Sequence, residues 1–194
     1  MTLKEVKKEA KHYILEGQSK QETFEQLKKK ADGSVPVDKI VRVVESIPSL
    51  QARKKYGIWN TILIALLGIT VLGKVLTAFS MIENIGMAGT PFILLLPLIN
   101  VLLLWGVATY TPGTYIAAAV LAGISITGLW KNAGKLHADP NHWLLLINFI
   151  IMLGIIVLGI FLHFKLFQSH RIESEQYFDE EGKVRYRSQI RIDD

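Results

Sequence analysis

Polar and ionisable side chains within long apolar runs are the residues of this sequence whose type and setting could do chemistry. Between residues 56 and 164 formal charges are scarce, and Lys74 is the charge furthest inside an apolar run. An ionisable residue at membrane depth is costly and is a functional hypothesis by default. With four uncharged residues in comparable positions it forms a predicted intramembrane polar cluster: Lys74, Asn100, Ser125, Thr127 and Asn148.

These polar residues also have purely structural explanations. Lys74 lies about six residues from the end of its apolar run, so its stem is long enough to place the ammonium group in interfacial water. Amide and hydroxyl groups can form hydrogen bonds between helices. The sequence therefore leaves two interpretations open, a polar cavity in the outer half of a membrane or a set of structural hydrogen bonds.

The sequence offers little support for a metal site or for a catalytic nucleophile. His137, Asp139 and His142 offer three metal-ligating side chains, but their spacing matches no zinc signature and Pro140 interrupts a helical face. The chain has no cysteine. It also lacks the phosphate-binding, dinucleotide-binding, zinc-protease and serine-hydrolase motifs. We therefore expect no metal, no cofactor and no enzymatic activity.

Four apolar runs must position the polar cluster. Residues 56–164 carry five formal charges, whereas residues 1–55 hold thirteen of the chain's 22 lysines and arginines. A spanning helix needs about 20 mostly apolar residues. We predict an all-α membrane protein with a four-transmembrane-helix bundle, its spans at about 56–80, 91–110, 114–130 and 143–167. A Pro-Gly turn at 110–114 joins the second and third spans.

Aromatic and small residues support these spans. Aromatic rings with a polar edge prefer the membrane interface, and seven of them lie near predicted ends: Tyr56, Trp59, Trp105, Tyr110, Tyr115, Trp130 and Trp143. In the third span Ala119, Gly123 and Thr127 repeat at four-residue spacing. Such a face of small residues lets a neighbouring helix approach closely, so we predict helix packing there.

Residues 1–55 predict a small cytoplasmic helical module. Thr2 with Glu5, and Ser19 with Glu22, have the spacing of capping boxes, and Gly17 suits a helix end. We expect helices at about 3–16, 20–31 and 36–47, and a fourth that starts after Ser49 and continues into the first span. Six lysines are candidate contacts to a partner or to anionic lipid: Lys7, Lys8, Lys11, Lys28, Lys29 and Lys30. Eight interspersed acids argue against nucleic acid.

Residues 183–192 alternate between apolar and charged or polar side chains, which predicts a strand. With the segment before the turn-forming Asp179–Gly182, they predict a short β-hairpin at about 172–192. An isolated hairpin is marginal in water, so this tail packs on the amino-terminal helices, pairs with a partner strand, or is disordered. The predicted parts are thus a module at 1–55, a membrane domain at 56–168 and a tail at 169–194.

Location and function follow from these parts. Lysine and arginine beside the first and fourth spans predict that both termini are cytoplasmic, although Lys131 and Lys135 in an outer loop run against the rule. We expect an integral protein of a bacterial inner (plasma) membrane. Its partners would be the lipid bilayer and a protein partner or second copy bound through the cytoplasmic ends.

The expected role is a non-catalytic scaffold, accessory or regulatory subunit. The alternative is a small oligomeric transporter or channel that uses the polar cluster. A lipid-modifying enzyme is a third hypothesis, for which the sequence offers no catalytic cluster.

Overall fold

The computed structural model describes part of the 194-residue chain in full detail. The backbone is described for residues 1–85, 90–131, 142–167, 171–178 and 184–192, and side chains for residues 1–80, 97–128, 143–167 and 192. The chain divides into two compact units. We name Met1–Lys55 with Lys165–Asp194 the terminal unit, and Tyr56–Phe164 the apolar unit.

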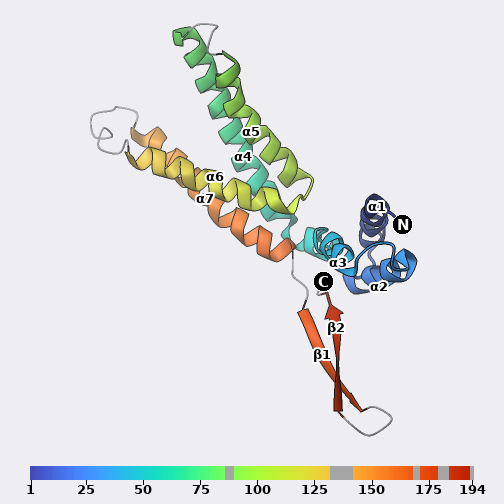
Figure 1. The fold of residues 1–194 in the computed structure, drawn as a ribbon. Helices are drawn as coiled ribbons and strands as arrows, with labels where there is room; N and C mark the ends of the chain where they lie inside the picture. Colours follow the sequence, from blue (N-terminus) through green and yellow to red (C-terminus); the bar gives the residue numbers. More distant parts are fainter. Residues whose placement is uncertain (86–89, 132–141, 168–170, 179–183, 193–194) are drawn as a thin grey trace. The chain divides into compact units, whose positions relative to one another are not determined.

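The terminal unit contains three short helices that pack on one another: α1 (Leu3–Leu15), α2 (Lys20–Ala31) and α3 (Val37–Glu45) (Figure 1). Both predicted capping boxes are confirmed, because Thr2 and Ser19 each exchange hydrogen bonds with the glutamate three residues later. The hydrogen bond from the Thr2 backbone N–H holds the pKa of Glu5 below its ordinary value. These caps satisfy amide groups that a helix start would leave without a partner.

The helix α1 ends where the sequence predicts, just before Gly17. Gly17 has a φ of 97°, its N–H donates to the Ile14 carbonyl, and the Gln18 N–H donates to the Tyr13 carbonyl. This pair of bonds is a Schellman motif, in which a glycine takes the left-handed conformation at low cost. The predicted stop at Gly17 is confirmed. The third helix is shorter than expected, because Pro36 lies at its cap position and the helix ends at Glu45.

The core of the terminal unit is built from one face of each helix, from Val35 and Ile47 on either side of α3, and from one residue of the tail. The spacing of three and four residues along α1 and α2 brings their apolar side chains to a common stripe. Ile192, near the other end of the chain, is buried in the same cluster. Its members are Val6, Ala10, Ile14, Phe24, Leu27, Ala31, Val35, Ile40, Val41, Val44, Ile47 and Ile192.

Two antiparallel strands precede Ile192, β1 (Arg171–Phe178) and β2 (Val184–Arg191). Their register pairs Ile172 with Ile190 and Phe178 with Val184. The turn predicted at 179–182 lies outside the described residues. After β2, the Ile192 N–H donates to Gln21 Oε1 at 3.0 Å, so the end of the tail contacts α2.

Four longer helices follow α3: α4 (Leu50–Ile85), α5 (Thr90–Ala108), α6 (Pro112–Lys131) and α7 (His142–Leu166). Ser49 caps α4 by accepting a hydrogen bond from the Ala52 N–H at 3.2 Å. The predicted continuation of the fourth helix into the first apolar run is confirmed, since α4 is one helix of 36 residues. Among the described residues, two stretches are long and apolar enough to cross a membrane, Leu50–Ser80 and Trp143–Leu166.

The turn between α5 and α6 differs from the predicted Pro-Gly turn. Tyr110 takes the left-handed conformation, with a φ of 57°, and the Thr111 N–H donates to the Gly106 carbonyl at 2.8 Å. The Tyr110 N–H donates to the Val107 carbonyl, which completes a second Schellman motif. Pro112 is already the first residue of α6, where its missing N–H costs nothing. The Pro-Gly pair therefore starts the helix and does not form the turn.

Close helix approaches in the apolar unit occur at glycines other than the one predicted. A Cβ on Gly159 of α7 would lie 2.9 Å from the Tyr115 carbonyl oxygen of α6 and 3.4 Å from the Ala119 Cβ. A Cβ on Gly106 of α5 would overlap the Thr114 side chain. The predicted face behaves differently, because no described atom lies within 4 Å of a Cβ on Gly123, and Thr127 is exposed. Of that face, Ala119 takes part in a close contact.

Gly159→Ala should therefore destabilise the protein by about 1–3 kcal/mol, because the added methyl group meets backbone atoms that cannot turn away. Gly123→Ala, in the open part of α6, is the matched control and should be neutral or slightly stabilising. Thermal unfolding in detergent, followed by circular dichroism, measures both. Equal effects of the two substitutions would show that α6 and α7 do not meet at Gly159.

Candidate functional site

A small cavity lies among the four helices of the apolar unit. Polar side chains from three helices line it, Thr70 and Lys74 of α4, Asn100 of α5 and Ser125 of α6. The volume open to the centre of a water molecule is about 10 Å³, which is close to the room that one water needs. The remaining lining is apolar: Leu67, Leu103, Ala118, Leu121, Ala122, Met152 and Ile155.

Helical spacing explains how α4 contributes to this cavity. Leu67, Thr70 and Lys74 are separated by three and four residues, so they share one face of the helix. Thr70 is buried and Lys74 is half-buried. Asn100 is also buried and lies three residues after Pro97, which removes one backbone hydrogen bond from α5. The cavity thus joins one cationic side chain to uncharged polar groups.

Both hydroxyl groups that line the cavity donate hydrogen bonds to backbone carbonyls of their own helices. Thr70 Oγ1 donates to the Leu67 carbonyl at 2.7 Å, and Ser125 Oγ donates to the Leu121 carbonyl at 2.9 Å. Each hydroxyl oxygen therefore keeps its lone pairs as acceptors. An ammonium group has three donors and no acceptor. Lys74 is thus matched with acceptor oxygens across a space for one small polar molecule.

The lining combines one amine with hydroxyl and amide groups. Among the described side chains that line the cavity, none is a carboxylate or a histidine, and Lys74 is the one ionisable group. The volume excludes any molecule much larger than water.

The structure brings three of the five predicted cluster residues together, Lys74, Asn100 and Ser125, and leaves two outside. Thr127 is exposed, and its hydroxyl donates to the Ile124 carbonyl at 2.7 Å. Residues two apart on a helix do not face the same way, so Ser125 and Thr127 cannot both line the cavity. Asn148 lies on the stripe of α7 that carries Met152, but one turn earlier, roughly 6 Å along the axis.

Sequence reasoning missed Thr70, although a signal was present. Thr70 lies four residues before Lys74 in an apolar run, and this spacing places both on one helix face. It also missed Lys20, the first residue of α2, which is buried and has a partner. No local pattern marks a lysine at a helix start as buried, so that position depends on packing.

A second polar contact holds the apolar unit together at the start of α6. The Tyr115 hydroxyl lies 2.7 Å from Asn60 Oδ1 of α4 and 3.3 Å from the Val107 carbonyl oxygen of α5. Tyr115 is 0% exposed and Asn60 is 3% exposed. His163 Nδ1 of α7 lies 3.2 Å from the Pro112 carbonyl oxygen. Tyr115 was predicted near a span end, and it lies in the first turn of α6, where Asn60 supplies a buried partner for its hydroxyl group.

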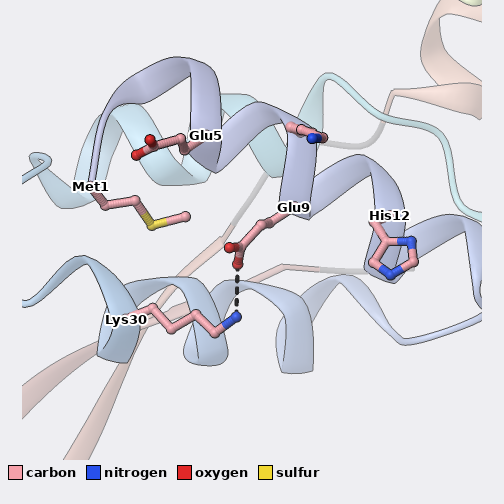
Figure 2. Close-up of a pocket in the computed structure, with 6 residues that line it drawn as sticks. Met1, Glu5, Glu9, His12 and Lys30 are labelled. Atoms are coloured by element: carbon pink, nitrogen blue, oxygen red, sulfur yellow. Dashed lines mark hydrogen bonds and ion pairs between the residues drawn. The ribbon is translucent and has the colours of Figure 1, made fainter.

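A shallow depression marks the surface of α1 and α2 in the terminal unit. Figure 2 shows Lys30 of α2 opposite Glu9 of α1, with the Lys30 Nζ to Glu9 Oε2 distance at 2.9 Å. Lys30 also donates to the Tyr13 hydroxyl and lies 5.2 Å from the centre of that ring. These bonds, that to Tyr13 first, raise the pKa of Lys30. The depression is lined by Met1, Glu5, Lys8, Glu9, His12 and Lys30.

The six candidate lysines are exposed, but they do not form one basic surface. Lys8 and Lys30 line the depression together with Glu5 and Glu9. Lys28 and Lys29 line another depression with Glu25 and Asp32. Lys7 and Lys11 are exposed on α1. Acids interspersed among the lysines weaken attraction to a uniformly anionic surface.

The described residues hold no group of three His, Cys, Asp or Glu side chains suited to a metal ion. The side chains of His137, Asp139 and His142 lie outside the described part. Comparison with known proteins gives no further guide: no protein family, curated protein or solved structure matches this chain. The site must therefore be interpreted from its own geometry.

The Tyr115–Asn60 contact gives a sharp prediction. Tyr115→Phe should destabilise the apolar unit by about 1–3 kcal/mol, because the buried Asn60 Oδ1 loses its partner. Adding Asn60→Leu should recover part of that loss, since no polar atom is then left unsatisfied. Unfolding of the single and double variants in mixed detergent measures the coupling. Additive effects in this double-mutant cycle would contradict a direct hydrogen bond.

Proposed function

We propose that this protein is a four-span integral membrane protein with a non-catalytic role, a scaffold, accessory or regulatory subunit. The observation that carries the proposal is the exposure of large apolar side chains on all four helices of the apolar unit. Examples are Ile58 on α4 (69% exposed), Trp105 on α5 (71%), Ile124 on α6 (61%) and Ile150 on α7 (66%). In water, apolar surface on this scale would drive aggregation, whereas lipid covers it without cost.

Helix length supports four spans. At 1.5 Å per residue, the 19 residues of α5 and the 20 residues of α6 extend roughly 28–30 Å, about the thickness of the hydrocarbon core. Both helices pack as neighbours, and both carry apolar side chains that no described residue covers. Exposed apolar side chains on α5 and α6 favour four spans over a chain in which α4 and α7 alone cross the bilayer.

We further propose that both termini lie in the cytoplasm, in a bacterial inner (plasma) membrane. Arg53, Lys54 and Lys55 precede the apolar part of α4, and Lys165 lies at the end of α7. Lysine and arginine beside the spans favour retention of those ends on the cytoplasmic side. The tail would then form its β-hairpin of about 172–192 in the cytoplasm, beside the amino-terminal helices.

Labelling of a cysteine placed at Gly113 distinguishes a four-span topology from a two-span topology. The residue is exposed at the start of α6, and a Cβ there would have no described atom within 4 Å, so a cysteine should be tolerated. Because the chain has no cysteine, Gly113→Cys is the single thiol. In intact cells a membrane-impermeant maleimide should label it after permeabilisation only. Labelling of Gly113→Cys from outside, with Glu16→Cys protected, would show that α5 and α6 do not cross.

The scaffold role is supported by the terminal unit. Its helices have a core of their own and present charged side chains of both signs, a surface typical of protein recognition. The cavity of the apolar unit has room for about one water, so it supports no substrate-sized site. A second candidate function, a small oligomeric transporter or channel, is favoured by the meeting of Lys74, Asn100 and Ser125. Flux into liposomes that Lys74→Ala and Asn100→Leu abolish would support it.

Charge reversal on α2 tests the scaffold role. Lys28→Glu with Lys29→Glu should reduce, at least about tenfold, the cross-linking of the full chain to a partner or second copy in native membranes, because rim charges set recognition. Lys4→Glu with Lys39→Glu, two lysines that are also exposed, is the control and should leave the cross-linking unchanged. Absence of any cross-linked partner or self-assembly for the unmodified chain would contradict a scaffold function.

A further inference from the structure

Ile192, the last described residue, is held inside the core of the terminal unit by two different contacts. Its side chain is 3% exposed and belongs to the cluster formed by α1, α2 and α3. Its main-chain N–H donates to Gln21 Oε1 at 3.0 Å, across 171 positions of sequence. The helices therefore recognise both a side chain and the backbone of the tail.

Gln21 is positioned for this role by a neighbour on α2. Gln21 Nε2 donates to Glu25 Oε1 at 2.8 Å, one helical turn away. This bond uses the amide nitrogen, so the amide oxygen is the atom left to accept from an incoming N–H. Proteins that bind extended segments at a sheet edge combine main-chain hydrogen bonds with pockets for side chains, and this helical face supplies one contact of each kind.

We infer that the face of α1–α3 around Gln21 is a binding site for an extended peptide with a buried β-branched residue, and that the chain's own residues 184–192 are its resident ligand. The strand β2 brings the chain to the site already extended, and Ile192 is the anchor. A two-stranded hairpin is marginal on its own in water, so docking of Ile192 also stabilises the tail. This assigns a ligand to the module, and it stands whether or not the protein is a scaffold.

Occupation by a covalently attached ligand has a measurable consequence. A site filled by its own tail binds an added copy of the segment weakly, because apparent affinity falls with the fraction of open sites. Removal of the anchor should open the site. The experiment uses the full chain in detergent and, as the probe, a fluorescent peptide of residues 184–192. Ile192→Asp should bind this peptide at least about tenfold more tightly than the unmodified chain.

Matched variants separate recognition from general damage. Leu3→Asp changes an exposed apolar residue of α1, so a chain with this substitution should bind the peptide as weakly as the unmodified chain does. A peptide carrying Ile192→Asp should not bind. In the Ile192→Asp chain, Gln21→Met removes the acceptor at nearly constant size and should weaken peptide binding several-fold, whereas Gln21→Glu keeps an acceptor oxygen and should bind more tightly than Gln21→Met.

The hydrogen-exchange rate of the Ile192 amide gives a second readout, which does not require a substitution at Ile192. In the unmodified full chain the Ile192 amide should exchange slowly, and Gln21→Met should accelerate it. Exchange as fast as in the free peptide would overturn the inference. Equal peptide binding by the unmodified chain and Ile192→Asp would also overturn it. A dimer that Ile192→Asp dissociates would replace the resident tail with that of a second copy and so overturn occupation within one chain.

Discussion

The hydrogen bond between Tyr115 and Asn60 is a buried polar contact that constrains how α4 and α6 face each other in the apolar unit. Both side chains are buried among apolar groups, where an unpaired hydroxyl or amide would carry its full desolvation cost. Apolar packing is non-directional, so it does not choose which faces of four similar helices meet. A buried polar pair does select the faces, because its hydrogen bond forms only when the two helix faces that carry the groups lie opposite each other. Around this pair, Gly159 and His163 bring α7 to the first turn of α6.

The polar cavity follows from this choice. On α4, Lys74 lies fourteen residues after Asn60, roughly 21 Å along the helix, so the face turned toward α6 at Asn60 sets which residues line the bundle interior further on. With the faces fixed, Lys74 meets Asn100 and Ser125, and Thr127 is left outside. The structural hydrogen bond and the candidate site are therefore parts of one arrangement of the four helices.

The terminal unit reaches stability by a different route. Three helices within about 50 residues bury little apolar surface, and small modules of this kind are marginal by themselves. Here the chain supplies a further core residue from its own tail, Ile192, together with a backbone hydrogen bond to Gln21. Local signals start and end the helices, whereas closure of the core depends on a residue from the far end of the chain. Because it binds an extended segment, the same face of the terminal unit is also a recognition surface.

The sequence by itself determined the local structure of this protein. Capping boxes at Thr2 and Ser19, the stop at Gly17 and the continuous α4 all follow from interactions within a few residues, and so does the apolar character of α4–α7. It also pointed to Lys74, Asn100 and Ser125, because a polar residue in an apolar run is conspicuous. Tertiary structure alone decided that Tyr115 is buried, that Gly159 and not Gly123 carries the close approach, and that Ile192 enters the helical core. These facts depend on the rotation and approach of helices, which long-range contacts set and which no local pattern encodes.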